Sequence, residues 1–258
     1  MFDTETIPDI PALRHLQNAN PELTDDEVIA AAQTDDRPVK PGLQCIVAVA
    51  GAWIAPNGTL RQLRALGDPG WSETELVRET FRIISEGHPQ LVGWNTSGFD
   101  LPVLVYRAMV HQIAAPGFYQ FGEPYHGYRK RFDEESHIDL MDILSFYGAS
   151  PRLKLDEMAT VLGIPGKLGI DGSQVWPLYQ VGELEAIRTY CTSDVLTTAL
   201  VYGRYALHRG WWDETQMTTF EESVAAWLDA QDGPTWTAFR TAWHPVVANV
   251  VGRKPWDA

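Results

Sequence analysis

Met1-Phe2-Asp3-Thr4-Glu5 opens the chain, and the rest of the sequence is best understood from it. Residues 2–7 predict a β-strand that ends at Pro8. Alternate side chains of a strand point to the same face, so we expect Asp3 and Glu5 to present two carboxylates side by side. Adjacent carboxylates repel and raise each other's pKa unless a cation lies between them. Oxygen ligands of this kind suit hard divalent ions such as Mg²⁺ or Mn²⁺.

Two later stretches carry further acidic residues that could join this pair. Asn95-Thr96-Ser97-Gly98-Phe99-Asp100 lies where a short buried strand, residues 91–94, turns into a helix. Tyr190-Cys191-Thr192-Ser193-Asp194 lies within the longest helical pattern, residues 184–208, where Tyr190 and Asp194 are one turn apart. Each stretch also has an ordinary interpretation: a solvated strand end for the first pair, a helix N-cap for Asp100, and a helix surface for the last two.

The order of predicted elements indicates an α/β protein. Residues 44–54 and 59–63 predict a β-hairpin, and residues 72–86 predict a helix with a cap pattern at Ser72 and Glu75. Short elements are expected at 138–144 and 153–162, and two helices in the tryptophan-rich segment 211–258. Residues 9–42 form an insertion with a capping-box pattern at Thr24 and Glu27, which predicts a short helix and a loop. A mobile surface segment is the alternative interpretation. We expect a first domain at 1–210 and a helical extension at 211–258 packed on it.

Composition narrows the class of protein. The chain has 258 residues, a formal net charge of −14 and two cysteines, Cys45 and Cys191, with no CxxC spacing. A disulfide framework or thiolate zinc site is therefore not expected, and a cytoplasmic location is the default expectation. No apolar run approaches the length of a membrane span, and no signal peptide is evident. The acidic charge argues against a broad electropositive nucleic-acid surface, although bound metal ions can supply positive charge locally.

The three acidic stretches, in this order and on these elements, resemble the exonuclease motifs of the DEDDy class of the ribonuclease H-like (DnaQ-like) superfamily. The Phe-Asp-x-Glu-Thr and Asn-x-x-x-Phe-Asp spellings are most similar to the proofreading exonuclease domain of B-family DNA polymerases and its stand-alone relatives. The resemblance covers about residues 1–210. It implies a ribonuclease H-like mixed five-stranded sheet flanked by helices, here followed by the C-terminal helical extension.

The resemblance also implies a role for each motif residue. Asp3, Glu5, Asp100 and Asp194 would bind two divalent ions, Mg²⁺ or Mn²⁺, with Asp3 bridging them, and Tyr190 would contact the attacking water. Thr4, Asn95 and Phe99 would contact the terminal nucleotide. The resemblance further implies 3′→5′ hydrolysis of single-stranded or frayed DNA 3′ ends, with release of nucleoside 5′-monophosphates. Two metal ions suit this chemistry because one activates the water and the other stabilises the leaving oxygen.

Two other functions remain open from the sequence. The same site could act on RNA, since the residue that would sense the 2′-hydroxyl is not evident. Alternatively the fold could be a non-catalytic binding module, which the acidic charge and the tryptophan-rich extension favour but the intact carboxylate set does not. Candidate stacking aromatics are Trp94, Phe99 and those within 118–128, and the basic run Arg129-Lys130-Arg131 is either a phosphate contact or an ordinary loop. No protein partner is indicated.

Overall fold

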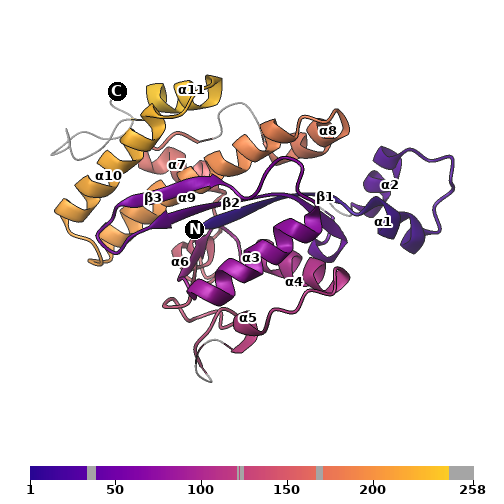
Figure 1. The fold of residues 1–258 in the computed structure, drawn as a ribbon, viewed down its shortest axis with the longest axis horizontal. Coiled ribbons are helices and arrows are strands. Elements are labelled where there is room, and N and C mark those ends of the chain that lie inside the picture. Colours follow the sequence, from indigo (N-terminus) through magenta and orange to yellow (C-terminus); the bar gives the residue numbers. More distant parts are fainter. Residues whose placement is uncertain (34–38, 121, 123–124, 167–170, 244–258) are drawn as a thin grey trace.

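The computed structural model describes residues 1–33, 39–120, 122, 125–166 and 171–243 (Figure 1). The elements follow in the order β1 (Phe2–Pro8), α1 (Ile10–Gln17), α2 (Asp25–Ala32), η1 (Pro41–Leu43), β2 (Gln44–Ile54), β3 (Leu60–Ala65), α3 (Glu73–Gly87), β4 (Leu91–Gly93), α4 (Asp100–Val110), α5 (Pro116–Gln120), β5 (His137–Asp139), α6 (Leu140–Leu144), α7 (Leu155–Leu162), η2 (Gly172–Gln174), α8 (Val175–Gln180), α9 (Leu184–His208), α10 (Glu214–Asp229) and α11 (Pro234–Ala242). None of the described helices has an apolar stretch long enough to cross a membrane.

The strands form two hydrogen-bonded sheets. β1, β2 and β3 make an antiparallel sheet in that order, with Phe2 opposite Gly51 and Pro8 opposite Gln44. β4 and β5 make a separate parallel pair. The α/β class is confirmed, but the single five-stranded sheet expected from the sequence is not seen among the described residues. The physical reason is the shortness of β4 and β5, which have three residues each and end at once in turns, so little backbone is left for a ladder to β1.

β4 nevertheless lies directly against β1, and Gly93 permits this. A Cβ on Gly93 would be 3.1 Å from the carbonyl oxygen of Phe2 and 2.2 Å from Cγ2 of Thr96. A Cβ at 2.2 Å from the Thr96 methyl is not tolerated and one at 3.1 Å from the Phe2 oxygen is tight, so a larger residue at 93 would force Thr96 and the β1 backbone to shift. The close approach brings the turn that follows β4 beside the acidic residues of β1.

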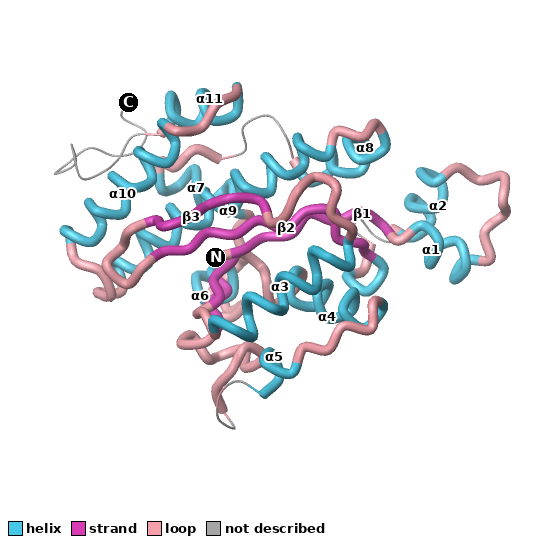
Figure 2. Tube along the Cα trace, viewed as in Figure 1, coloured by secondary structure: helices cyan, strands magenta, loops and turns pink. Residues whose placement is uncertain are grey.

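Helices cover both faces of the antiparallel sheet (Figures 1 and 2). α3, α4 and α5 lie on one side, and α9 with α7, α8, α10 and α11 lies on the other. Each side has its own apolar core: Phe2, Ile46 and Val49 face the first, while Ala48 and Ala50 face the second. α9 contacts the sheet as well as α7, α8 and α10, so it is buried on more sides than the single apolar stripe in its sequence indicates.

The predicted helix starts are confirmed at atomic detail. In α2 the backbone N–H of Thr24 donates to Glu27 at 2.8 Å, and Thr24 Oγ1 accepts from the Glu27 N–H, which makes a complete capping box. α3 begins in the same way with Ser72 and Glu75. These contacts satisfy backbone donors that a helix leaves unpaired at its start. The short helices α1, α5 and α8 were not predicted from the sequence.

The C-terminal helices α10 and α11 share the core of α9. Trp212, Trp236 and Trp243 are buried there, whereas Trp211 is 39% exposed. Trp212, Trp236 and Trp243 therefore belong to the core and not to the surface of the protein. The rest of the predicted extension, 244–258, lies outside the described residues.

Candidate active site

β1 holds the first two carboxylates of the site on the side that faces α9. Carboxylate oxygens of Asp3 and Glu5 and the Sγ of Cys191 all lie within 4.8 Å of one another. The Cys191 thiol donates to the Asp3 carbonyl oxygen at 3.4 Å and approaches Asp3 Oδ2 at 3.6 Å. The alternation expected for this strand therefore holds at its acidic pair, and α9 packs directly behind it.

Asp100 is the first residue of α4, and its carboxylate turns toward β1 rather than capping its own helix. Thr4 donates to Asp100 Oδ1 twice, from its backbone N–H at 2.9 Å and from its hydroxyl at 2.7 Å. The helix N-cap is Phe99, which makes no side-chain cap hydrogen bond. Asp100 and Thr4 are both buried, with 3% and 5% of their surface exposed. Thr4 thus fastens the mid-chain acidic residue to the strand that carries the first two.

α9 contributes the remaining pair. The Tyr190 hydroxyl shares a hydrogen bond with Asp194, one helical turn further on, and the charges of Glu5 and Asp3 act on the same phenol. Asp194 and Asp100 both act on Asp3. All five residues proposed from the sequence as catalytic therefore converge, from segments almost 200 residues apart.

The pKa values of Asp3, Asp100 and Tyr190 are raised by burial and by nearby negative charge. Burial, and then the charges of Asp100, Glu5 and Asp194, raise the pKa of Asp3 well above its usual value. Burial also raises the pKa of Asp100 to about 6, although the hydrogen bonds from Thr4 oppose the shift. The pKa of Tyr190 is raised too, by burial and by the charges of Asp194 and Glu5, so its phenol stays protonated at neutral pH. Hard divalent cations would relieve this repulsion, and the all-oxygen carboxylate set is one that they prefer.

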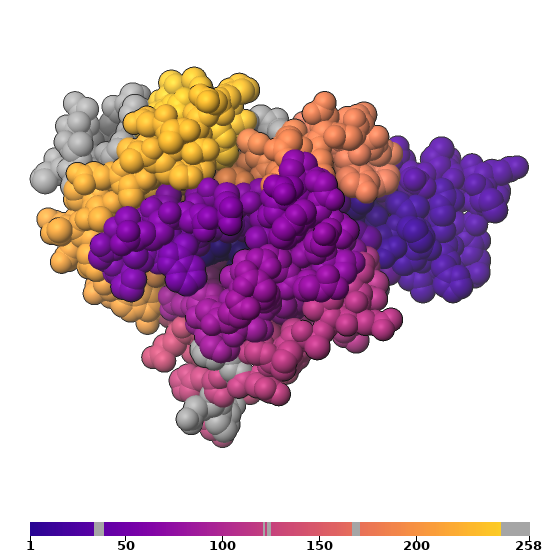
Figure 3. Space-filling view, viewed as in Figure 1, coloured from indigo at the N-terminus to yellow at the C-terminus, as the bar shows by residue number. Residues whose placement is uncertain are grey.

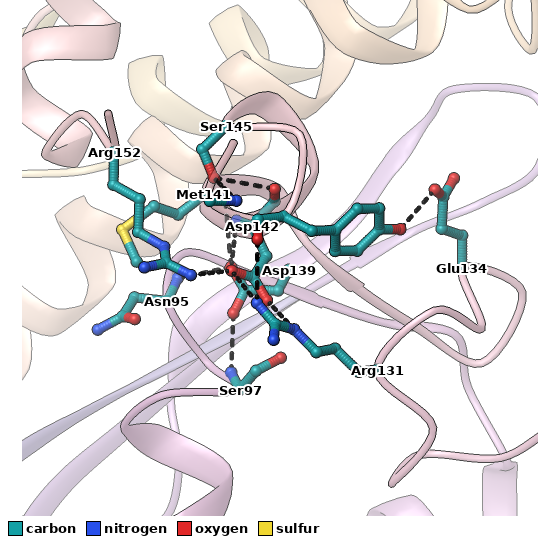
Figure 4. A network of polar contacts seen from close by, with 11 residues as sticks. Asn95, Ser97, Arg131, Glu134, Asp139, Met141, Asp142, Ser145 and Arg152 are labelled. Carbon is teal, nitrogen blue, oxygen red and sulfur yellow. Dashed lines mark hydrogen bonds and ion pairs between the residues drawn. The ribbon is translucent and has the colours of Figure 1, made fainter. Parts of the chain in front are cut away.

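The turn between β4 and α4 is held by a residue that the sequence did not single out (Figure 4). Asp139, at the end of β5, accepts from the backbone N–H groups of Asn95 at 3.0 Å and Ser97 at 2.9 Å. It also accepts from the N–H groups of Met141 and Asp142 and so caps α6. Asn95 itself has a φ of 61° in the left-handed region. Asp139 therefore fixes the backbone that leads into Asp100.

A signal for Asp139 was present in the sequence. His137-Ile138-Asp139-Leu140 places an acidic residue at a strand end just before a helix, which is also the context of Asp100. His137, left unassigned from the sequence, is hydrogen-bonded to Thr96 Oγ1 at 2.8 Å and supports the same turn. For Cys191 the sequence holds no such signal, because it has no cysteine or histidine nearby at the spacing of a metal or redox site.

The basic run Arg129-Lys130-Arg131 has structural partners. Arg131 is bidentate to Asp142, at 2.9 and 3.1 Å, and Arg152 reaches the same carboxylate at 2.7 Å (Figure 4). The Arg129 guanidinium lies over the Tyr119 ring, 4.8 Å from its centroid. These arginines line a cavity of about 740 Å³ together with Asn95 and Ser97 of the turn between β4 and α4.

The predicted substrate contacts divide between two cavities. Thr4 and Phe99 line a cavity of about 700 Å³ that also includes Glu5, whereas Asn95 lines the other one. Trp94 is 9% exposed and packed in the core, so its ring offers little surface for stacking. Of the aromatics in 118–128, Phe118 and Tyr128 are buried against each other, Tyr119 and Tyr125 are exposed, and Phe121 lies outside the described residues.

A protein family matches most of the chain. A model of predicted 3′–5′ exonucleases related to the exonuclease domain of PolB matches residues 39–243, more than half of the chain. The matched segment contains the Asn95–Asp100 turn and the Tyr190–Asp194 pair, while Asp3 and Glu5 precede it and join the site through the contacts above. A comparison with curated proteins finds none that matches. On the family match, the chain belongs to the predicted 3′–5′ exonucleases related to the exonuclease domain of PolB.

Proposed function

We propose that this protein is a metal-dependent 3′→5′ exonuclease that removes nucleoside 5′-monophosphates from single-stranded DNA ends. The observation that carries the proposal is the convergence of Asp3, Glu5, Asp100 and Asp194, with the pKa of Asp3 raised by burial and then by the charges of the other three. A protein gains nothing in stability from burying mutually repelling carboxylates, so their retention supports a cation-binding role. The antiparallel sheet followed by a parallel strand pair supports a ribonuclease H-like fold.

In this proposal the carboxylates hold two divalent cations, Mg²⁺ or Mn²⁺. When bound, such ions activate a water molecule and neutralise the charge that develops on the phosphate and the leaving oxygen. Asp3, Glu5 and Asp194 face one another from β1 and α9, and Asp100 completes the set from α4. Four carboxylates against two divalent cations leave a nearly neutral cluster that can accept an anionic phosphate.

Tyr190 acts as a positioning group for the water. Its raised pKa keeps the phenol protonated, so it orients the water through hydrogen bonds and is not the proton acceptor. Attack of the water on the terminal phosphorus breaks the bond to the 3′-oxygen of the preceding nucleotide. The released nucleotide therefore carries its phosphate on the 5′ carbon, and the shortened strand ends in a 3′-hydroxyl.

The direct test uses oligonucleotides labelled at the 3′ or the 5′ end, incubated with purified protein and Mg²⁺, Mn²⁺ or EDTA. We expect stepwise shortening from the 3′ end with either metal ion and none with EDTA. Asp194→Asn should abolish the shortening, whereas Asp229→Asn, at an exposed aspartate near the end of α10, should leave it unchanged. Absence of metal-dependent shortening of DNA and RNA alike would refute the proposal. Matched DNA and RNA oligomers in the same assay decide between the two substrates.

A further inference from the structure

The insertion between β1 and β2 forms a small arm with its own core. Helices α1 and α2 pack around Leu13, Val28 and Val39, which form a cluster separate from the two cores of the main body. The arm projects from one end of the sheet (Figure 1). The family match begins at residue 39, so both helices lie outside it. The arm is therefore a feature of this chain to which the matched family assigns no role.

Two polar contacts fix the arm against the body. At its base Asp9 pairs with Arg107 of α4 at 2.7 Å, and both side chains are largely buried. At its outer end Trp176 of α8 donates from Nε1 to Asp26 of α2 at 2.7 Å. Figure 3 shows the arm and the α8 region in direct contact on the surface. The Asp26–Trp176 hydrogen bond therefore joins two elements 150 residues apart in sequence.

The space enclosed by these contacts is the cavity of about 700 Å³ beside Glu5. Its lining includes residues 4–6 and 8 of β1, Phe99, Trp176 of α8, and Ile29 and Gln33 from α2 and its C-cap. Its volume falls within the roughly 300–1,000 Å³ typical of ligand pockets. The arm thus supplies one wall of the cavity that opens at the proposed catalytic carboxylates.

The lining of this cavity suits an uncharged aromatic group. Of the described residues that line it, Glu5 alone carries a charge, and the rings of Phe99 and Trp176 supply aromatic surface. Gln44, 6% exposed, also lines it, and its buried Oε1 accepts no hydrogen bond from any described residue. A buried acceptor without a donor costs free energy, so a ligand or a water that donates there is favoured. A nucleobase supplies the flat aromatic ring that Phe99 and Trp176 could stack on.

We propose that the α1–α2 arm, held in place by the Asp26–Trp176 hydrogen bond, forms the outer wall of a pocket for the unpaired base of the terminal nucleotide. This inference rests on the proposed exonuclease function and adds a specificity determinant to it. From Ile10 to Ala32 the arm contains four acidic residues, Glu22, Asp25, Asp26 and Glu27, against one cation, Arg14. Arg14 pairs with Asp25, so a second strand approaching this wall would still meet a net negative charge. The arm therefore selects single-stranded ends over paired ones.

The test measures binding of deoxyadenosine 5′-monophosphate by calorimetry in the presence of Mn²⁺. Trp176→Ala should weaken binding about tenfold, because stacking on one base is lost. Asp26→Ala and Trp176→Phe should weaken it roughly threefold, since each removes the hydrogen bond to the arm but keeps an aromatic ring at position 176. Asp26→Asn is the matched control, since its side-chain oxygen still accepts from the indole, and should bind like the wild type. Asp26 is exposed, so Asp26→Ala leaves the core intact, whereas Trp176 packs partly against the core and its variants need a check of folding by thermal unfolding.

The second measurement compares kcat/KM for a single-stranded oligonucleotide and for the same strand in a blunt duplex. We expect Asp26→Ala and Trp176→Ala to raise KM for the single strand with little change in kcat, and to reduce the single-strand preference. Unchanged nucleotide affinity and unchanged preference in both variants would overturn the role of the arm. Nucleotide binding that depends on Trp176 in a protein that hydrolyses nothing would instead refute the exonuclease function and leave the pocket standing.

Discussion

Two groups of acidic side chains lie on either side of the turn between β4 and α4, and their surroundings are opposite. On one side burial raises the pKa of Asp3 and of Asp100, and the charges of Asp100, Glu5 and Asp194 raise the pKa of Asp3 further. On the other side burial would raise the pKa of Asp142, but hydrogen bonds and charge from Arg131 and Arg152 lower it overall. The neighbouring Asp139 accepts four backbone N–H groups.

The contrast separates a binding role from a structural one. A carboxylate whose partners are built into the chain stabilises the fold by itself. A carboxylate surrounded by its own kind is held in place by other contacts, here Thr4 and the packing of α9, and becomes favourable only when a cation arrives. Substitution of Asp3 should therefore stabilise the metal-free protein and impair hydrolysis. Substitution of Asp142 should destabilise the protein and leave hydrolysis largely unchanged.

The largest difference is expected between Asp3→Asn and Asp142→Asn. Asp3→Asn should reduce kcat/KM by about a thousandfold or more, equivalent to about 4 kcal/mol of transition-state stabilisation, and should make the metal-free protein more stable. Asp142→Asn should keep hydrolysis within about threefold and lose roughly 1–2 kcal/mol of stability, because Arg131 and Arg152 are about half exposed and partly screened. Hydrolysis assays and urea unfolding in EDTA measure both effects. A stability loss in Asp3→Asn would contradict the contrast.

Asp139 should affect both properties, because it holds the turn that positions Asp100. Asp139→Ala removes the acceptor for four backbone N–H groups and should cost about 2–4 kcal/mol of stability. A loosened turn should also lower kcat, on the order of a hundredfold, with a smaller change in KM. Asp139→Asn keeps one acceptor oxygen and should fall between the wild type and Asp139→Ala. Full activity in a destabilised Asp139→Ala protein would show that the turn does not position Asp100.

The raised pKa of Asp100 predicts how pH affects the metal-free protein. Its unfolded pKa is near 3.8 and its folded pKa is about 6, so between these values the folded state keeps a proton that the unfolded state releases. Stability in EDTA should therefore fall as the pH rises from about 4 to 6, by at most about 3 kcal/mol from this group. Asp3 adds to the effect in the same direction. Asp142, whose pKa is lowered, contributes stability that is lost only at more acid pH.

Saturating Mg²⁺ is the control for this dependence. Because the cation favours the ionised carboxylates, it should remove the loss of stability above pH 6, and its affinity should fall as the pH drops below 6. Asp100→Asn should flatten the stability profile in EDTA between pH 4 and 6. A profile that is the same with and without Mg²⁺ would show that the cluster does not bind the ion.

Much of the fold follows from local signals in the sequence. The capping boxes at Thr24 and Ser72 and the long pattern at 184–208 predicted α2, α3 and α9 closely, because helix caps and apolar periodicity act over a few residues. The division of the strands into two sheets was not predictable in this way. It depends on how β4 and β5, of three residues each and far apart in the chain, pair with each other and then end.

In the candidate site, too, local motifs were predictable from the sequence and long-range contacts were not. Residue types and motif order identified Asp3, Glu5, Asp100, Tyr190 and Asp194, since each motif is a short local pattern. The residues that hold them, Asp139 and Cys191, act across distant segments and carry no spacing of their own. Likewise the link between Asp26 and Trp176 could not be deduced from either stretch alone.

The smallest effect is expected at Cys191, which joins α9 to the first carboxylate. A thiol is a weak donor, so its contact with Asp3 contributes little, and Cys191→Ser keeps a donor at the same place. Cys191→Ser should change kcat/KM by no more than about threefold and stability by less than about 1 kcal/mol. Cys191→Ala removes the donor and leaves the Asp3 oxygens without it, so it should be the more damaging of the two. Equal effects of serine and alanine on Mn²⁺ affinity would mean that packing of α9, and not the thiol, orients Asp3.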